Sequence, residues 1–213
     1  MISARELHEG AAKLEVTLSA PQEALLLRYL DLLKKWNQVY NLTAIREDEK
    51  LVSYHLLDSL AIVPYMIGVS MIDIGTGAGL PGIPVAVARP DLRVVLLDSN
   101  HKKTAFLRQT IGELDLSNVE VAMERAESYH PSDRFSVAVS RAFSDLKTFA
   151  EVSRHLIRTD GALLAMKGIY PNEELEQLPS YARVEKVVRL TVPGLGAERH
   201  LVLLKTHSPQ APT

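Results

Sequence analysis

Three glycines and two acids are the residues whose types and spacing can hold a ligand. The glycines stand at alternate positions of one short stretch: Gly75, Gly77 and Gly79. Glycine adopts positive φ easily and lets the backbone approach a ligand closely. One acid, Asp73, lies in the apolar run 71–74, and the other, Asp98, ends the apolar run 94–97. Because Asp98 follows the glycines by about 20 residues, the spacing of a ribose-binding carboxylate, the two runs predict a site for an adenosine-containing cofactor.

The order of the glycines indicates which cofactor the loop suits. We interpret the run as Asp-x-Gly-x-Gly-x-Gly rather than Gly-x-Gly-x-x-Gly, with no third glycine placed where a helix N-terminus receives a pyrophosphate. S-adenosylmethionine carries a cationic sulfonium, which Asp73 would attract, whereas the same carboxylate would repel a dinucleotide pyrophosphate. No Gly-Lys-Ser/Thr follows, which excludes a Walker-type phosphate loop. The alternative is a plain tight turn between a strand and a helix.

Length, charge and cysteine content limit the class of protein. The chain of 213 residues is long enough for one α/β core with a helical extension. It has no cysteine, so disulfides, thiolate metal sites and cysteine nucleophiles are absent, and we expect no metal site. A net charge of −2 argues against nonspecific coating of nucleic acid, although a local basic face stays possible. We find no signal peptide and no apolar run of membrane-spanning length, so we expect a cytoplasmic protein without membrane contact.

The apolar pattern predicts the elements that must position these residues. A helix should begin at Ser19 with a capping box to Gln22, and another should cover 58–66, so residues 1–67 form a helical segment packed on the core. Residues 68–207 then form the α/β domain, and 208–213 a disordered tail. The expected strands are 71–74, 93–98, 119–123, 135–140, 160–167, 182–191 and 199–206. The expected helices are 82–88, 100–114, 145–157 and 172–178.

The spacing of the last two strands predicts how the sheet ends. Residues 192–198 are too few for a crossover helix, so the final strands must pair antiparallel. The expected fold is therefore a doubly wound, seven-stranded, Rossmann-like sheet, mostly parallel with an antiparallel C-terminal hairpin. This is the arrangement of S-adenosylmethionine-dependent methyltransferases rather than of dinucleotide dehydrogenases.

Ordered segments between about Leu30 and Leu204 carry a resemblance to a known family. The segments are Lys35–Thr43, His55–Ser59, Asp73–Pro84, Leu97–Ser99, Phe106–Arg108, Arg125–Glu127, Ser140–Ala142, Lys167–Gly168 and Glu198–Leu201. They resemble the bacterial small-subunit ribosomal RNA guanine-N7 methyltransferases of the RsmG (glucose-inhibited division protein B) family. The resemblance implies S-adenosylmethionine as cofactor and, as substrate, one guanine of the decoding-region loop of 16S rRNA, position 527 in the usual numbering. The substrate would be the small ribosomal subunit or an assembly intermediate, with no obligatory protein partner.

The resemblance also implies roles for particular residues. Added to the residues of the glycine loop, it makes the expected cofactor-binding set Asp73, Gly75, Gly77, Gly79, Leu80, Asp98, Ala126, Glu127 and Arg141. Ala126 and Glu127 would lie beside the adenine. Arg141, after the fourth strand, would orient the target base through guanine O6 or the cofactor through its carboxylate; the alternative is a surface ion pair. Because guanine N7 already carries a lone pair, we expect alignment of the reactants and no general base.

Polar residues outside the cofactor set are candidates for RNA contact. They are Asn41, Thr43, His55, Lys102, Lys103, Lys167, Arg199 and His200. Alternatives remain for most of them. Asn41 and Thr43 could instead be a helix C-cap and the next N-cap. Arg199 and His200 could tie down the final hairpin.

Two further residue groups allow a structural or a functional role. His55 and Asp58 lie three apart, on one helix face, where a catalytic pair is imaginable. In the structural alternative, Asp58 caps a helix and His55 is a satisfied histidine. We expect Trp36 to pack in the core rather than stack on a base.

Two other functions compete with the methyltransferase interpretation. A nicotinamide-dependent oxidoreductase would use the same kind of sheet, but the glycine spacing and the final hairpin argue against it. An RNA-binding or assembly factor could keep the fold without turnover. The presence of Gly75, Asp98 and Arg141 gives no sign of a decayed cofactor site.

Overall fold

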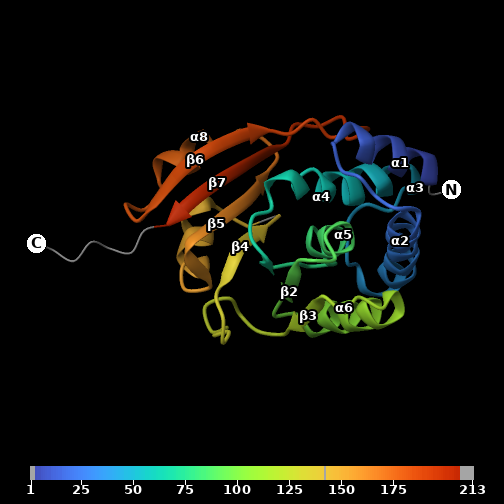
Figure 1. Ribbon diagram of the computed structural model, residues 1–213, viewed down its shortest axis with the longest axis horizontal. Helices are drawn as coiled ribbons and strands as arrows, with labels where there is room; N and C mark the ends of the chain where they lie inside the picture. Colours follow the sequence, from blue (N-terminus) through green and yellow to red (C-terminus); the bar gives the residue numbers. More distant parts are fainter. Residues whose placement is uncertain (1–2, 142, 207–213) are drawn as a thin grey trace, which may run out of the picture.

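The strands form one sheet in the computed structural model, which describes residues 3–141 and 143–206. They are β1 (Ser70–Ile74), β2 (Arg93–Leu97), β3 (Val119–Ala122), β4 (Phe135–Ser140), β5 (Ile157–Lys167), β6 (Ala182–Arg189) and β7 (His200–Thr206). Their order across the sheet of the described residues is β3-β2-β1-β4-β5-β7-β6 (Figure 1). The strands from β3 to β5 are parallel, and β7 runs antiparallel to both β5 and β6. The expected doubly wound sheet with an antiparallel end is confirmed.

Helices pack against the sheet, and those that precede residue 70 form an N-terminal extension. They are α1 (Ala4–Lys13), α2 (Ala20–Tyr40), α3 (Asp48–Leu51), α4 (Asp58–Leu60), α5 (Gly82–Ala88), α6 (His101–Leu114), α7 (Leu146–Ser153) and α8 (Asn172–Glu176). The capping box predicted at Ser19 and Gln22 is present at the start of α2. Figure 1 shows α1 to α6 gathered over one part of the sheet, away from the strand pair β6 and β7.

The helix predicted at 58–66 is wrong at both ends. Helical structure begins at Asp48, passes through the π-helical segment Val52–Leu57, and ends in α4, while 63–65 form a short 3₁₀ turn. No side chain caps the start of α3, so the usual sequence signal for a helix beginning is missing. Pro64 lacks a backbone N–H and does not continue an α-helix.

Several other boundaries differ from those predicted. The helix expected over 145–157 ends at Ser153, and β5 begins at Ile157 rather than at 160, because Ile157 pairs with Phe135 of β4. The helix expected over 172–178 ends at Glu176. The expected tail, 208–213, lies outside the described residues. The division at residue 67 into two units stays a prediction.

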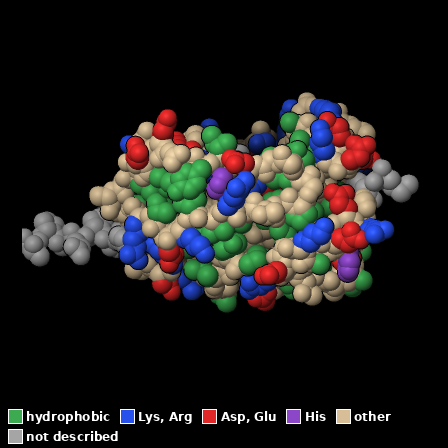
Figure 2. All heavy atoms as spheres, turned by 90° about the horizontal axis from the view of Figure 1, so that it is seen from above, with side chains coloured by type: hydrophobic (Ala, Val, Ile, Leu, Met, Phe, Trp, Pro, Cys, Tyr) green, Lys and Arg blue, Asp and Glu red, His purple; other side chains and the backbone are tan. Residues whose placement is uncertain are grey.

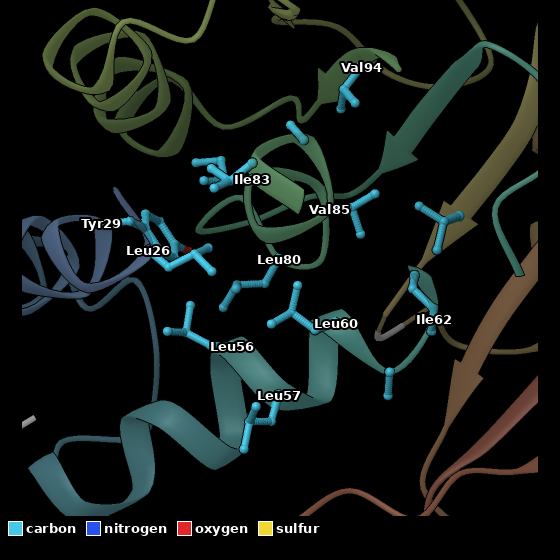
Figure 3. Packing of buried hydrophobic residues seen from close by; sticks show 14 of the residues in the cluster. Leu26, Tyr29, Leu56, Leu57, Leu60, Ile62, Leu80, Ile83, Val85 and Val94 are labelled. Carbon is cyan, nitrogen blue, oxygen red and sulfur yellow. The ribbon is translucent and has the colours of Figure 1, made fainter. Parts of the chain in front are cut away.

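The core on one face of the sheet joins the N-terminal helices to the glycine loop. Alternate residues of each central strand face opposite ways: Met71 lies in this cluster, and Ile72 in the cluster on the other face. Figure 3 shows the side chains that meet in the first cluster, among them Leu26, Tyr29, Leu56, Leu57, Leu60, Leu80 and Ile83. Helix α2 and the helical stretch 52–60 thus pack directly against α5 and the loop before it. No helix in the described ranges combines the length and apolar character needed to cross a membrane.

Two helix glycines should respond in opposite ways to a side chain. A Cβ at Gly10 in α1 would overlap the methyl groups of Leu57, so we expect Gly10→Val to lower the free energy of unfolding by about 1–3 kcal/mol through overpacking. A Cβ at Gly112 in α6 would have no atom within 4 Å, so Gly112→Ala should raise it by roughly 0.5–1 kcal/mol. Urea unfolding measures both values. If both substitutions changed the free energy of unfolding in the same direction, the packing described for α1 would be contradicted.

Candidate functional site

The glycine loop continues directly from β1 at the carboxyl edge of the sheet. The backbone N–H groups of Gly75 and Thr76 both donate to the carbonyl of Leu97 in β2, at 2.8 and 3.1 Å. The φ angles of Gly75, Gly77 and Gly79 are all positive, between 62° and 90°. β1 has β2 on one side and β4 on the other, so the chain order reverses here. In open α/β sheets such a switch point is where ligands bind.

The glycines of the loop divide into two kinds. A Cβ at Gly75 would meet nothing within 4 Å, and one at Gly77 only a carbonyl at 3.9 Å, so both face open space. A Cβ at Gly79 would press on Ile83 and Leu107. Gly79 therefore serves the packing of α5, and a cofactor contact through its backbone stays a prediction.

Gly82 corrects the sequence-based interpretation of the glycine spacing. Gly77, Gly79 and Gly82 do satisfy Gly-x-Gly-x-x-Gly, so a third glycine stands at the start of α5. A Cβ at Gly82 would overlap Leu96 and approach Asp73. The glycine spacing therefore does not exclude a dinucleotide, and that prediction was wrong. The buried acid Asp73 and the antiparallel strand β7 still argue against a dinucleotide.

Asp73 braces the loop from inside. Its side chain is fully buried, and Oδ2 accepts hydrogen bonds from Thr76 Oγ1 at 2.6 Å and from the Gly82 N–H at 2.8 Å. Burial raises the pKa of Asp73 to about 6, although these two hydrogen bonds oppose the shift. Oδ1 has no hydrogen-bond partner among the described residues. The carboxylate thus fixes the loop and places negative potential behind it.

A pocket of about 140 Å³ opens at the carboxyl ends of β1 and β2. Its lining comprises Ile74, Gly75, Leu97, Asp98, Ser99, Glu124, Arg125, Ala126, Glu127 and Phe143. Asp98 is nearly buried; its Oδ2 accepts from the Gly77 N–H at 3.0 Å and its Oδ1 from the Asn100 N–H at 2.8 Å. The fold thus brings Gly75, Asp98, Ala126 and Glu127 together, as expected for residues that end or follow neighbouring parallel strands.

A larger pocket, of about 380 Å³, lies elsewhere. It is lined by α7 and by the starts of β4 and β5, with Arg134, Arg154 and Arg158 among its residues. It contains neither a glycine loop nor an acid at a strand end. We therefore place the candidate site at the smaller pocket, which has both. No three acidic or histidine side chains in the described part of the chain are arranged to hold a metal ion.

Arg141 belongs to a partly buried ionic network. Its Nη1 donates to Asp58 Oδ2 at 3.3 Å and to the carbonyl of Tyr54 at 3.1 Å. Asp58 is fully buried, and its Oδ1 accepts from Arg199 Nε at 2.8 Å. Asp58 lies within continuing helical structure, so the alternative in which it caps a helix is wrong. The ion pair expected as the alternative for Arg141 exists, but its acid is buried rather than on the surface.

His55 is connected to Thr43 rather than to Asp58. His55 is 2% exposed, and its Nε2 lies 3.2 Å from Thr43 Oγ1; the Thr43 N–H donates to Asn37 Oδ1 at 2.9 Å. Burial and the nearby Arg141 lower the pKa of His55 to about 4. Asn41 is the C-cap of α2, as one alternative predicted, but Thr43 is not an N-cap, because α3 begins after Glu47.

Several of the other candidate residues already have protein partners. Lys167 Nζ pairs with Glu174 at 2.7 Å, and the buried His200 contacts the carbonyl of Gly168 through Nδ1 at 3.0 Å. Lys103 Nζ lies 3.7 Å from Asp98. Leu80 is 4% exposed and packs in the core, so only its backbone remains for a cofactor. Trp36 packs against the core, as expected.

Sequence reasoning missed three residues that shape the loop. Thr76 and Gly82 hold the carboxylate of Asp73, and Tyr29 of α2 donates through its hydroxyl to the carbonyl of Ala78 at 2.8 Å. Thr76 and Gly82 lie within the motif itself, where a hydroxyl and a further glycine were visible signals. No local signal points to Tyr29, because its partner is 49 positions away.

We expect the buried groups His55 and Asp73 to act on stability with opposite signs. The pKa of His55 falls from 6.5 to about 4, so its contribution is complete above pH 6.5 and is lost as the pH falls through 4. The pKa of Asp73 rises from 3.8 to about 6, so its contribution is complete below pH 3.8 and is lost as the pH rises through 6. In thermal unfolding between pH 4 and 7, the stability of His55→Gln relative to the wild type should increase as the pH falls. The stability of Asp73→Asn relative to the wild type should increase as the pH rises. Parallel curves would contradict these shifts.

Known proteins are similar to this chain in sequence and in fold. A family described as rRNA small subunit methyltransferase G (GidB) matches residues 22–202. The ribosomal RNA small subunit methyltransferase G of Chromobacterium violaceum is 58% identical over 92% of this chain and 95% of its own length. The protein of the same name from Laribacter hongkongensis is 54% identical, over 93% and 96% respectively.

Similarity to a solved structure supports the fold independently. The O-methyltransferase TomG from Streptomyces achromogenes, solved in complex with SAM, superimposes with a TM-score of 0.57 over 91% of this chain and 92% of its own, at 15% identity. At that identity the likeness concerns the fold alone, which is the Rossmann-like methyltransferase fold. Together with the near full-length sequence relatives, these matches lead to one conclusion: the chain belongs to the rRNA small subunit methyltransferase G family.

Proposed function

We propose that this protein transfers the methyl group of S-adenosylmethionine to N7 of one guanine in the decoding-region loop of 16S rRNA. The observation that carries the proposal is the pocket at the ends of β1 and β2, where a glycine loop, Asp98 and the 124–127 segment meet in a member of this family. The substrate is the small ribosomal subunit or an assembly intermediate, and methylation takes place in the cytoplasm.

The residues of the pocket fit S-adenosylmethionine. Gly75 and Gly77 leave an open cradle that any Cβ would enter, and this cradle suits the amino-acid tail. Asp98 stands at the end of β2, where a carboxylate accepts hydrogen bonds from ribose hydroxyls. Ala126 and Glu127 offer an apolar and a polar contact for the adenine. The buried Asp73 adds negative potential behind the loop, which suits a cationic ligand.

The protein contributes orientation rather than proton transfer. When bound, the cofactor supplies an electrophilic methyl group, and guanine N7 has a lone pair in the plane of the base, so no proton must be removed first. His55 is buried and engaged with Thr43, which fits this absence of a general base. Proximity and in-line alignment then account for the acceleration. A guanine in folded RNA must also be unstacked, which calls for partners on the protein side.

We assign the orientation of the reactants to Arg141. It follows β4, next to the switch point of the sheet. Its contacts with Asp58 and Tyr54 use Nη1, while a guanidinium has five N–H donors in all. The remaining donors can meet guanine O6 or the carboxylate of the cofactor. Asp58 would then hold the guanidinium at a constant angle.

Recognition of RNA relies on particular contacts rather than on overall charge. The net charge is −2, and Figure 2 shows acidic and basic side chains scattered among hydrophobic ones on the face that it presents. Asn41, Thr43, His55, Lys102, Lys103, Lys167, Arg199 and His200 remain candidates for these contacts. Of these, His55, Lys167 and His200 would have to exchange their present partners for RNA.

The decisive experiment uses the natural substrate. Purified protein is incubated with S-adenosylmethionine and small ribosomal subunits from a strain that lacks this gene, and methylated bases are located by chemical cleavage at N7-methylguanosine. Methylation of a single decoding-loop guanine is the expected result. Binding of S-adenosylmethionine without any methylation of the subunit would overturn the proposed substrate and favour an assembly factor.

Gly77→Arg should abolish binding of S-adenosylmethionine, because the side chain would fill the open cradle. The cost to stability should stay near 1–2 kcal/mol, the usual penalty for a non-glycine residue at positive φ. Gly112→Arg, on an open face of α6, makes the same chemical change away from the loop and should bind normally. Isothermal titration calorimetry gives both affinities. Unchanged affinity in Gly77→Arg would contradict the placement of the cofactor.

Arg141→Ala should lose activity by about 10- to 100-fold, in line with the loss of a hydrogen bond from a charged group. Its free energy of unfolding should fall by far less than this loss of activity corresponds to, because Asp58 keeps its hydrogen bond to Arg199. Asp58→Asn weakens the same bridge but leaves the guanidinium in place, with an amide oxygen that can still accept from it, so it should lose less activity than Arg141→Ala. Single-turnover methylation and thermal unfolding separate the two effects. An equal loss of activity in Asp58→Asn would mean that Arg141 acts only through the ion pair.

A further inference from the structure

A column of aromatic rings leads from the core to the surface beside the candidate site. Phe106 of α6 is fully buried, and its ring centroid lies 5.6 Å from that of Trp36 in α2. The Trp36 ring in turn lies 5.0 Å from that of Tyr40, the last residue of α2. Tyr40 is 41% exposed, and its neighbour Val39 is 70% exposed. The column thus holds an exposed aromatic ring on a rigid base.

A lysine lies over this exposed ring. Lys102 Nζ is 6.0 Å from the centroid of Tyr40, within reach of a weak cation–π interaction. Within the described residues, Lys102 forms no ion pair with a carboxylate, unlike Lys103, which approaches Asp98. The ammonium group is therefore free to meet an anion while it stays near the ring.

The pair lies next to the pocket that we assign to the cofactor. Lys102 is in the first turn of α6, where its backbone N–H donates to the side chain of Asn100 at 2.9 Å. The Asn100 N–H donates to the carboxylate of Asp98 at 2.8 Å, so the start of α6 is tied to the pocket wall. Lys102 therefore lies two positions after Asn100, whose backbone N–H is anchored on the strand-end acid.

The chain that leaves Tyr40 leads to the segment that contacts Arg141. Asn41 ends α2 in a left-handed conformation, and Thr43 then contacts His55 in the π-helical segment. The same segment offers the carbonyl of Tyr54 to Arg141. Tyr40 and Arg141 are thus placed by one continuous run of contacts along the N-terminal helices.

We propose that Tyr40 and Lys102 bind an unpaired RNA nucleotide that flanks the target base, with the nucleobase stacked on Tyr40 and a phosphate paired with Lys102. An aromatic face beside a cation is the combination with which proteins hold single-stranded RNA, because every base offers a flat face and every linkage a negative charge. The proposal rests on the proposed function and deepens it by assigning a contact outside the cofactor pocket. It also assigns a function to the exposed ring of Tyr40, which the packing of the core does not require.

Binding of unmethylated small ribosomal subunits tests the proposal. Tyr40→Leu keeps an apolar contact with Trp36 but removes the flat ring, and it should weaken binding about 5- to 100-fold. Tyr40→Phe keeps the ring and should bind within about twofold of the wild type. Lys102→Gln should weaken binding and reduce the slope of log affinity against log salt by about 0.7, the value for one phosphate of a single strand. The affinity for S-adenosylmethionine should not change in any of them.

A second tyrosine with a cation over its ring provides the matched control. Arg154 lies 4.7 Å from the ring centroid of Tyr181, beside α7 and the larger pocket. Tyr181→Leu and Arg154→Gln should leave subunit binding unchanged. Wild-type affinity in Tyr40→Leu and Lys102→Gln, or an equal loss in the Tyr181 and Arg154 variants, would overturn the proposal. Failure of the proposed function is distinct from this, because the wild type itself would then not methylate the subunit.

Discussion

The shape of the glycine loop depends on the buried carboxylate of Asp73. One oxygen holds both Thr76, in the middle of the loop, and the first backbone N–H of α5 at Gly82. A strand, a loop and a helix start are thereby fixed to one atom. The same closeness explains why residue 82 must lack a side chain, because a Cβ there would collide with Asp73 itself. The open cradle at Gly75 and Gly77 exists because the rest of the loop is held elsewhere.

A second buried acid, Asp58, joins parts of the chain that lie far apart in sequence. It binds Arg141 after β4 and Arg199 before β7, and so ties the N-terminal helices to both halves of the sheet. A buried charge left without any partner is costly, so Asp58 depends on the two arginines together. In our proposal, this dependence gives Arg141 a constant direction at the edge of the site.

Paired cations limit how this protein can meet RNA. Lys34, Lys103 and Lys167 each lie close to a carboxylate of the chain itself. Binding that depends on many phosphate contacts would need such groups to be free. The aromatic column that ends at Tyr40 offers a different source of affinity, since stacking gains little from net charge. Recognition in this picture rests on a few shaped contacts around one pocket.

The sequence by itself determined the succession of the strands and of the helices between them, the glycine loop after β1 and the acid Asp98 after β2. These features follow from apolar periodicity and from the backbone freedom of glycine, which act within a few residues. The helix that begins at Asp48 could not be predicted in this way, because no capping side chain marks its start. Only the tertiary structure decided that Asp58 binds partners 83 and 141 positions away, and that Gly82 packs while Gly77 stays open. Such roles depend on which atoms the fold brings together, and local pattern carries no information about distant neighbours.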